Sequence, residues 1–316
     1  MARRYAILGT GALGGFYGAL LCRAGAEVHF LLHGDFEHVR DHGLHVDSKD
    51  GDFVLPRVHA YRDVREMPRC DVVVVALKAT QNHLLPALLP PVVLDRGVVV
   101  LMQNGLGYEE EVASIVPGCE VLAGLCFLCS NKVGPGHIRH LDYGHVRLAK
   151  YAADGRPAGV SASMRELAAD LAAARISVDT HDDLLLARWQ KLVWNVPMSG
   201  LSVVLDADTR ALVTDPQTCS LAEAIMRDVV AGARACGREI RDDFVEKMLD
   251  MTRAMTPYQA SMKLDYDHGK PMEVEAIYGN PVRAAKAAGG AMPLVEMLYQ
   301  ELRFLDGRRA NLNRQG

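Results

Sequence analysis

The sequence predicts a two-domain protein: an amino-terminal α/β domain with a doubly wound parallel sheet, followed by an all-helical domain. Short apolar runs alternate with helical patterns in the first half of the chain, and a glycine-rich turn follows the first run. Long amphipathic segments with few valine-rich runs fill the second half. Strands that alternate with helices are typical of a parallel sheet whose faces are covered by helices. We place the boundary near residue 181, which gives domains of residues 1–181 and 182–316.

The apolar runs of the first half are rich in valine, leucine and isoleucine, and they are continuous rather than alternating. Continuous apolar character is expected of strands buried on both faces of a parallel sheet. The predicted strands are residues 5–8, 27–32, 71–77, 98–102, 121–128, 137–141 and 146–148. The predicted helices of this half are residues 16–24 and 163–174.

The second half is predicted to be helical throughout. Its helices are residues 184–205, 216–236, 242–255, 271–288 and 293–305. Gly237 and Gly289 stand where two of them are expected to stop. The polar tail, residues 306–316, is expected to fray.

Composition excludes several classes of partner. Hydrophobic residues make up 49% of the 316 residues and charged residues 23%, the balance of an ordinary globular protein. The net charge of -4 argues against nucleic acid, which needs a clustered basic face, and aromatic residues at 6% offer few stacking platforms. The expected partner is therefore a small molecule, with no nucleic acid and no membrane.

Cysteine usage and the first residues of the chain bear on location. Seven cysteines spread along the chain favour a reducing compartment over a disulfide framework. Cys126 and Cys129 form a CxxC, but residues three apart on a strand point to opposite faces, so a redox pair is disfavoured. Residues 3–26 resemble a signal peptide, yet the glycines that interrupt them favour a strand, a turn and a helix. We therefore expect a cytoplasmic protein.

The turn after the first predicted strand reads Gly9-Thr10-Gly11-Ala12-Leu13-Gly14. A GxGxxG between a strand and a helix is the setting in which a Rossmann domain binds a dinucleotide. Gly9 allows the tight turn, Gly11 lets the pyrophosphate approach the backbone, and Gly14 lets the helix pack against the sheet. The helix N-terminus then offers its N–H groups to the phosphates. The alternative is a purely structural glycine turn.

The end of the second predicted strand bears on the choice between NAD and NADP. An acidic residue there would hydrogen-bond the ribose 2′-hydroxyl of NAD, whereas a cation favours the 2′-phosphate of NADP. The strand ends at His33, and Asp35 follows two residues later. Because no carboxylate stands at the expected position, NADP is favoured, with His33 as a partial cation. The alternative is that His33 is a plain loop residue.

The predicted helix over residues 184–205 carries polar side chains from which chemistry is expected. Lys191, Asn195 and Ser199 are spaced by four residues, so they lie on one helix face, flanked by apolar side chains. Pro197 removes one backbone hydrogen bond and is expected to kink the helix. Lys191 is either a functional ammonium or an edge residue whose amine reaches solvent.

A second polar element runs from Ser261 to Glu273. Gly269, Lys270 and Pro271 predict a turn with proline at a helix start, which places Glu273 in the first helical turn. A carboxylate is favoured there by the helix dipole. Glu273 is thus a candidate functional carboxylate, or a solvated residue at a helix start.

These motifs together resemble the ketopantoate reductase (2-dehydropantoate 2-reductase) family over nearly the whole chain. The matching segments occur in the family's order: GTGALG at 9–14, ALKA at 76–79, QNGLG at 103–107, PGHIRH at 135–140, KLVWN at 191–195 and SMKLD…GKPMEVEAI at 261–277. The last is the most specific, because Ser261 and Glu273 stand twelve residues apart with the glycine–proline turn between them.

The resemblance implies roles for the residues of the helical half. Lys191 matches the family's general acid and Asn195 an amide that orients the substrate. Ser261 matches a substrate-binding hydroxyl, and Glu273 an acidic partner near the reacting centre and the cofactor. The implied activity is the NADPH-dependent reduction of ketopantoate, a 2-keto acid, to pantoate, and a homodimer is a further expectation.

For the first half, the resemblance implies cofactor contacts. Lys78 and Asn104 match cofactor-binding residues, and Asn104 also matches a substrate contact. The sequence departs from the family at two places: Ser199, assigned here to the substrate, stands where many members have a second asparagine, and His33 where an arginine often meets the 2′-phosphate. These departures leave the keto acid and the cofactor preference open.

Three alternatives follow from the same residues. The chain could reduce another 2-keto acid, because Ser199 changes the hydrogen-bonding groups of the pocket. It could instead be a non-catalytic Rossmann protein that senses NADP(H). The histidines His33, His38, His42 and His45 could bind a metal, but their spacing fits no closed ligand set, so loop solvation is favoured and no metal is expected.

Overall fold

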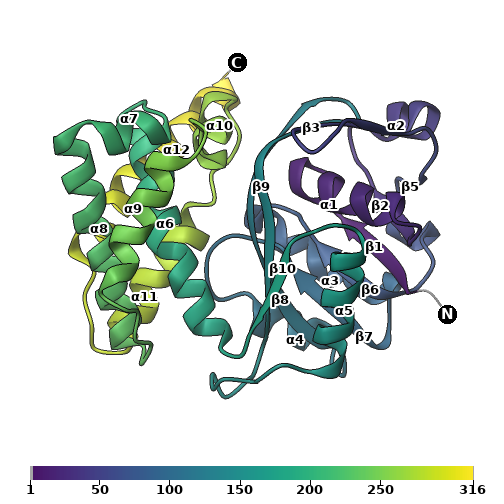
Figure 1. Ribbon diagram of the computed structural model, residues 1–316, viewed down its shortest axis with the longest axis horizontal. Coiled ribbons are helices and arrows are strands. Elements are labelled where there is room, and N and C mark those ends of the chain that lie inside the picture. Colours follow the sequence, from purple (N-terminus) through teal and green to yellow (C-terminus); the bar gives the residue numbers. More distant parts are fainter. Residues whose placement is uncertain (1–2, 316) are drawn as a thin grey trace. The chain divides into compact units, whose positions relative to one another are not determined.

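The computed structural model describes the backbone of residues 3–315 and the side chains up to residue 308 (Figure 1). The chain divides into two compact units. Unit 1 contains residues 3–103 and 108–184, and unit 2 contains residues 104–107 and 185–315. The short segment 104–107 thus interrupts unit 1 in the sequence but is counted with the helical unit.

Unit 1 is built on a ten-stranded sheet. Its strands are β1 (Arg4–Leu8), β2 (Glu27–Leu31), β3 (Leu44–Ser48), β4 (Phe53–Leu55), β5 (His59–Tyr61), β6 (Cys70–Val75), β7 (Val93–Leu101), β8 (Glu120–Gly134), β9 (His137–Lys150) and β10 (Val178–His181). They follow the order β4-β3-β9-β8-β7-β6-β1-β2-β5, with β10 paired to β9. The run from β8 through β7, β6, β1 and β2 to β5 is parallel, as the continuous apolar runs predicted.

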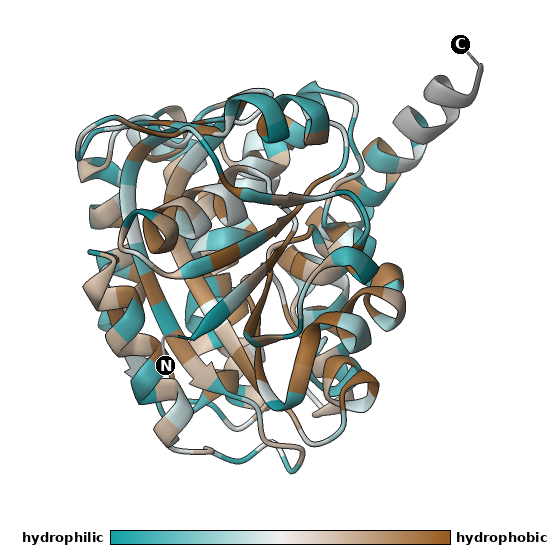
Figure 2. Ribbon diagram, turned by 90° about the vertical axis from the view of Figure 1, so that its right-hand side faces the viewer, coloured by the Kyte–Doolittle hydropathy of each residue, from teal (hydrophilic) through white to brown (hydrophobic). Residues whose placement is uncertain are grey.

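Helices cover both faces of this sheet. They are α1 (Ala12–Arg23), α2 (Phe36–His42), α3 (Leu85–Val92), α4 (Glu109–Ile115) and α5 (Ala162–Ala173), with short 3-10 turns η1 (Val64–Glu66) and η2 (Ala79–Leu84). Tyr5 and Ile7 of β1 belong to a core shared with α1 and α5, while Ala6 and Leu8 belong to a second core shared with α3 and α4. In Figure 2 the central strands are mostly hydrophobic (brown), and the helices beside them carry both hydrophobic (brown) and hydrophilic (teal) residues. The sheet is therefore doubly wound.

The sheet is mixed rather than wholly parallel, which corrects the expectation. β8 and β9 pair antiparallel over most of their length, and β9 joins the two strands predicted at 137–141 and 146–148 into one. The reversal follows from a tight turn after β8, where Gly136 has a φ of +60°. β3 and β4 also pair antiparallel.

The four histidines that the sequence assigned to a solvated loop are exposed, but only His33 lies in a loop, so the loop assignment was wrong for the other three. His38 and His42 lie in α2, and His45 lies in β3. Strands β3, β4, β5 and β10 were missed because they are only three to five residues long, and all but β4 carry polar side chains. Such strands form by pairing with a neighbour in the sheet and leave little apolar periodicity in the sequence.

Unit 2 consists of helices, with no strand among its described residues. They are α6 (Leu184–Val204), α7 (Thr209–Thr214), α8 (Pro216–Ala235), α9 (Asp243–Ala254), α10 (Ser261–Asp267), the π-helical turn η3 (Glu275–Gly279), α11 (Asn280–Ala287) and α12 (Pro293–Gln315). Gly237 and Gly289 follow α8 and α11 with positive φ angles, as predicted for helix ends. In the described part of the chain, no helix combines the length and apolar character that a bilayer crossing requires.

Two helix boundaries in unit 2 differ from the prediction. α12 continues past residue 305 to Gln315, because a polar segment without proline can remain helical. The helix predicted from Pro271 begins after Glu273 instead. Residues 270–273 stay non-helical, and the Met272 N–H donates to the Asp306 carboxylate (3.0 Å) rather than to a helical carbonyl.

The middle of α6 is held from the side by Tyr278. Pro197 has no N–H to donate to the carbonyl of Val193, so the helix loses one bond there. One residue earlier, the carbonyl of Val196 accepts a hydrogen bond from the fully buried Tyr278 hydroxyl (2.9 Å). A Cβ atom at Gly200 would lie 2.8 Å from the same hydroxyl oxygen, so Gly200 allows the tyrosine to approach α6.

Gly14→Ala is expected to lower the thermal midpoint of unfolding. A Cβ atom at Gly14 would lie 2.3 Å from the carbonyl oxygen of Gly9, and such overpacking costs about 1–3 kcal/mol. Gly11→Ala is the matched control, because a Cβ atom at Gly11 meets nothing within 4 Å and should change stability by at most about 0.5 kcal/mol. Equal midpoints for the two variants in differential scanning calorimetry would contradict the close packing at Gly14.

Tyr278→Phe is expected to destabilise the protein by about 1–3 kcal/mol, because the buried Val196 carbonyl loses a donor. Tyr299→Phe serves as the control. The Tyr299 hydroxyl donates to Glu275 (2.6 Å), whose carboxylate is exposed and also pairs with Arg283, so this loss should cost less than about 0.5 kcal/mol. The two unfolding midpoints, measured side by side, decide whether the hydroxyl of Tyr278 supports α6.

Candidate active site

The glycine turn of unit 1 has the form of a phosphate cradle. Gly9 adopts a φ of +100°, and a Cβ atom there would lie 2.7 Å from the backbone nitrogen of Leu77. Thr10 fastens the turn to β2, because its hydroxyl donates to the carbonyl of Leu31 (3.0 Å). Gly11 caps α1 without a side-chain hydrogen bond, and the space where its Cβ would point is open.

This geometry fits a pyrophosphate. The first N–H groups of a helix have no partner within the helix, and at α1 no side chain of the capping residue takes their place. Ala12, Leu13 and Gly14 form the first turn of α1, so their N–H groups point toward the open space beside Gly11. Anionic oxygens are favoured there by both hydrogen bonding and the helix dipole.

Lys78 lies at the same edge of the sheet. The carboxyl ends of β1 and β6 are neighbours, since the Ala76 N–H donates to the carbonyl of Leu8 (2.8 Å). Lys78 follows as a half-buried residue at the start of η2. The side-chain amide of Gln103 donates to the carbonyl of Leu77 (2.9 Å), so the end of β7 supports the loop that carries Lys78. The structure thus brings the glycine turn and Lys78 together.

The end of β2 presents one exposed imidazole and one buried carboxylate. His33 lies exposed in the loop between β2 and α2. The carboxylate of Asp35 turns inward. It accepts a hydrogen bond from the Gly136 N–H (3.0 Å) and forms an ion pair with Lys132 (2.5 Å). The first carboxylate after β2 in the sequence is therefore bound to β8 and to the turn that follows it.

In unit 2, α6 carries three of the predicted residues on one face. Lys191, Asn195 and Ser199 are each less than one-tenth exposed. The side-chain amide of Asn195 donates to the side-chain oxygen of Asn104 (3.4 Å), which brings the segment 104–107 against α6. The helix face that carries Lys191, Asn195 and Ser199 is therefore buried, and it contacts Asn104, another predicted site residue.

The segment 104–107 is held in place by η3 and α11. The Leu106 N–H donates to the carbonyl of Ala276 (3.0 Å), and the side-chain amide of Asn280 donates to the carbonyl of Leu106 (2.6 Å). Gly105 and Gly107 have positive φ angles, which allow the segment to turn between these contacts. Asn104 therefore owes its position to unit 2.

Glu273 and Ser261 lie in the adjoining stretch of unit 2. Glu273 is buried and immediately precedes the helical turn that leads into η3. Ser261 is half-buried and opens α10. The contact of Ala276 with Leu106 and that of Tyr278 with Val196 connect the segment after Glu273 to both the Asn104 loop and α6.

A second buried lysine of unit 2 has a structural role. Lys263 of α10 pairs with Asp206 (2.7 Å) and Asp267 (2.5 Å), which ties α10 to the end of α6. Burial acts to lower the pKa of Lys263, but its hydrogen bonds to the two carboxylates raise that pKa overall. An ammonium held in this way serves as an anchor for α10.

Several residues that shape the site were missed from the sequence. Tyr278 and Asn280 directly follow the motif at 261–277, and both contact segments that carry predicted site residues. A tyrosine in a buried apolar run needs a partner for its hydroxyl, and this was the available signal. The pairing of Asp35 with Lys132 had no signal, because Asp35 precedes α2 and Lys132 lies on β8, far along the chain.

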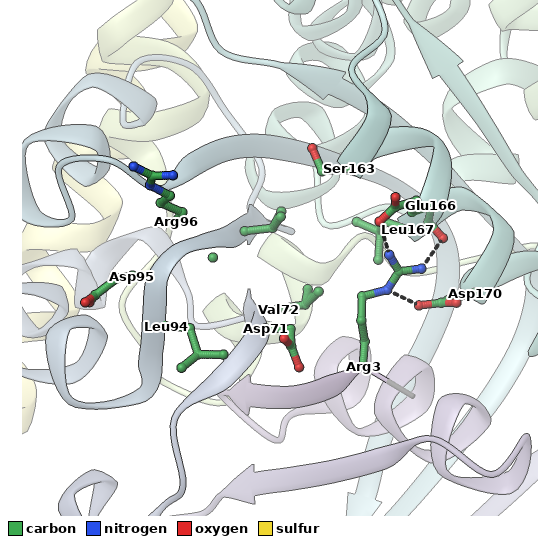
Figure 3. A pocket seen from close by; sticks show the side chains of 12 residues that line it. Arg3, Asp71, Val72, Leu94, Asp95, Arg96, Ser163, Glu166, Leu167 and Asp170 are labelled. Carbon is green, nitrogen blue, oxygen red and sulfur yellow. Dashed lines mark hydrogen bonds and ion pairs between the residues drawn. The ribbon is translucent and has the colours of Figure 1, made fainter. Parts of the chain in front are cut away.

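A hollow of about 570 Å³ lies elsewhere in unit 1 (Figure 3). Its lining comes from the residue before β1 and from β6, β7 and α5, and consists of Arg3, Asp71, Val72, Leu94, Asp95, Arg96, Gly97, Val98, Ser163, Glu166, Leu167 and Asp170. Arg3 and Asp71 stand at the amino-terminal ends of β1 and β6, opposite the end that leads into the glycine turn. Figure 3 shows the Arg3 guanidinium directed at Asp170 and Glu166. None of the predicted site residues lines this hollow.

Two family models and a related reductase match this chain over both of its units. Residues 5–153 match the family described as ketopantoate reductase PanE/ApbA, and residues 183–306 match its counterpart described as ketopantoate reductase PanE/ApbA C terminal. A 2-dehydropantoate 2-reductase of Nostoc sp. is 56% identical over 306 residues, which cover 97% of this chain and 96% of that protein.

Solved structures share the fold. A crystal structure of 2-dehydropantoate 2-reductase from Geobacter metallireducens has a TM-score of 0.90 at 41% identity, covering 95% of this chain and 99% of that one. A ternary structure of D-mandelate dehydrogenase with NADH and anilino(oxo)acetate has a TM-score of 0.84 at 20% identity over 97% and 99% of the two chains, a likeness of fold. The chain belongs to the ketopantoate reductase family of oxidoreductases.

Proposed function

We propose that this protein reduces 2-dehydropantoate (ketopantoate) to pantoate with NADPH, using Lys191 as the general acid. The observation that supports the proposal most directly is the buried face of α6, where Lys191 stands one helical turn from Asn195 and Asn195 meets Asn104. A buried ammonium beside amide groups suits a substrate that carries oxygen atoms and gains negative charge during reaction. Membership of the family supports the same activity.

Each polar residue of unit 2 has a defined task in this proposal. A bound nicotinamide would supply a hydride to C2 of the ketone. Lys191 stabilises the negative charge that develops on the ketone oxygen and donates a proton from Nζ to that oxygen. Asn195, Asn104 and Ser261 bind and orient substrate oxygens, and Glu273 provides the carboxylate that balances the ammonium.

The glycine turn and Lys78 would hold the cofactor. The open space beside Gly11 and the uncapped first turn of α1 suit the pyrophosphate, and Lys78 offers a cation at the same edge. The buried Asp35 supports NADP over NAD, because Lys132 and the Gly136 N–H both bind its Oδ2 atom and hold the carboxylate inward. NAD recognition by a ribose 2′-hydroxyl favours a carboxylate that is open at the end of the strand.

A second candidate activity is the reduction of another 2-keto acid. It is motivated by Ser199, which is buried on the same face as Lys191 and Asn195 and offers a hydroxyl where many members of the family have an amide. Comparing kcat/KM for ketopantoate and its branched analogues decides between the two substrates. Tight NADPH binding without oxidation by any keto acid would instead favour a sensor.

Location and assembly complete the proposal. A cytoplasmic location is supported by seven cysteines that are all free thiols, and burial raises the pKa of the Cys129 thiol to about 12, so this part of the CxxC is inert as a nucleophile. A homodimer is supported by Met297 and Phe304, two exposed apolar side chains seven residues apart on α12.

Lys191→Met is expected to lower kcat by about a hundredfold or more, because it removes the proton donor while filling a similar volume. NADPH oxidation in the presence of ketopantoate measures the effect. Lys263→Met is the matched control: it removes the other buried lysine of unit 2, which anchors α10, and should lower the unfolding midpoint while the folded enzyme keeps its kcat. Near-normal turnover of Lys191→Met would exclude Lys191 as the general acid.

The kcat/KM for NADPH is expected to exceed that for NADH. His33→Arg should widen the difference by improving kcat/KM for NADPH and leaving that for NADH unchanged, because guanidinium binds phosphate in two-point geometry. His38→Arg, at another exposed histidine of the same segment, is the control and should change neither value. Equal turnover of the unmodified enzyme with both cofactors at equal concentration would refute the NADP preference.

A further inference from the structure

Two histidines and an aspartate that have no part in the proposed catalysis meet on the β3–β9 pair of unit 1. His45 and His137 are direct neighbours in the parallel register of β3 and β9. Asp47 lies two residues after His45, so its side chain points to the same face of the sheet. We refer to these three residues as the His45–Asp47–His137 cluster.

The donor atoms of the cluster converge on a small volume. Nε2 of His45 lies 3.2 Å from Oδ1 of Asp47, and Nε2 of His137 lies 2.9 Å from Oδ2 of the same carboxylate. One ligand atom from each residue can be chosen so that all three lie within 4.8 Å of one another. Ligand atoms around a tetrahedral zinc ion are about 3.3–3.6 Å apart, given metal–ligand distances of roughly 2.0–2.2 Å. The contact of His45 is close to this spacing, and that of His137 is shorter and must open slightly.

Two further observations bear on access and support. The His45 side chain is 47% exposed, so an ion can reach the cluster and water can complete its coordination. Arg139, two residues after His137, donates to Oδ2 of Asp47 (3.2 Å). An outer hydrogen bond of this kind fixes the orientation of a ligating carboxylate, although the guanidinium charge weakens the attraction for a cation.

We propose that the His45–Asp47–His137 cluster binds a divalent transition-metal ion of the zinc class. Two imidazole nitrogens and one carboxylate oxygen are ligands that suit Zn²⁺, Ni²⁺ or Co²⁺, and they leave at least one position for water. The ion would join β3 to β9, two strands far apart in the sequence, and would thereby stabilise unit 1. The proposal does not depend on the reductase activity.

One adjustment of the side chains is needed. The two imidazole rings are stacked with centroids 4.3 Å apart and an interplanar angle of 4°, so their nitrogen lone pairs are parallel rather than convergent. Rotation of the exposed His45 ring toward Asp47 brings both lone pairs onto one ion. Without metal, the same residues form an ordinary cross-strand pair that shares a carboxylate.

A second histidine pair provides a matched control. His38 and His42 lie four residues apart on α2, with ring centroids 4.8 Å apart, and no carboxylate of the described residues joins them in a three-ligand group. The pair has the same number of imidazoles in the same unit. It therefore separates binding by this cluster from binding by any two neighbouring histidines.

The test is calorimetric titration of the untagged, chelator-treated full chain with Zn²⁺. We expect one site per chain, and we expect His137→Ala and Asp47→Asn each to weaken binding by about tenfold or more. His42→Ala should leave the affinity unchanged, and all variants should keep the NADPH oxidation rate of the unmodified protein. Saturating Zn²⁺ should raise the unfolding midpoint of the unmodified protein and not that of His137→Ala.

Three results would overturn the proposal. The first is the absence of a stoichiometric site. The second is loss of binding in His42→Ala with retention in His137→Ala, which would place the ion on α2. The third is an intense near-ultraviolet charge-transfer band when Co²⁺ replaces Zn²⁺, because such a band reports thiolate ligands and would place the ion at a cysteine.

Discussion

The hydrogen bond from Tyr278 to the carbonyl of Val196 joins the segments on which the candidate site of unit 2 depends. α6 is weakened at Pro197, between Asn195 and Ser199, and Tyr278 donates to it one residue before the proline. The same short stretch of chain accepts the Leu106 N–H at Ala276. One π-helical turn therefore holds both α6 and the segment that carries Asn104. A π-turn is rare, and it often marks a functional site.

The two units contribute different kinds of group. Unit 1 offers backbone N–H groups and open space beside Gly11. These features suit an anionic group with several oxygen atoms. Unit 2 offers buried side chains whose removal from water is costly. Lys263 offsets that cost with two carboxylates and anchors α10. Lys191 shares its buried helix face with the amide of Asn195 and the hydroxyl of Ser199, two groups that can hydrogen-bond oxygen atoms.

Much of this arrangement could be predicted from the sequence, because strong periodicity leaves a clear trace. β1, β2 and β8 begin or end within a residue or two of the predicted apolar runs, and α6 matches its predicted helix almost to the residue. The spacing of Lys191, Asn195 and Ser199 placed them on one buried face. The strands β3, β4, β5 and β10 left no such trace, since pairing with neighbours determines them.

Other features depended on contacts between distant residues, which one sequence does not reveal. Glu273 lies before its helix rather than in the first turn, and the preceding residue, Met272, donates its N–H to the distant Asp306. Asn104 follows a strand of unit 1, yet its segment is held by Ala276 and Asn280 of unit 2. The inward turn of Asp35 depends on Lys132 and Gly136, nearly one hundred residues later in the chain.

The proposed protonation of the ketone oxygen by Lys191 can be examined in a crystal structure of the complex with NADP⁺ and ketopantoate, in which the separation of the Lys191 amine and the C2 ketone oxygen is measured. If Lys191 is the general acid, these two atoms lie within hydrogen-bonding distance, about 2.6–3.2 Å. A bound keto acid whose ketone oxygen meets another donor, with the Lys191 amine turned away from it, would rule out Lys191 as the general acid.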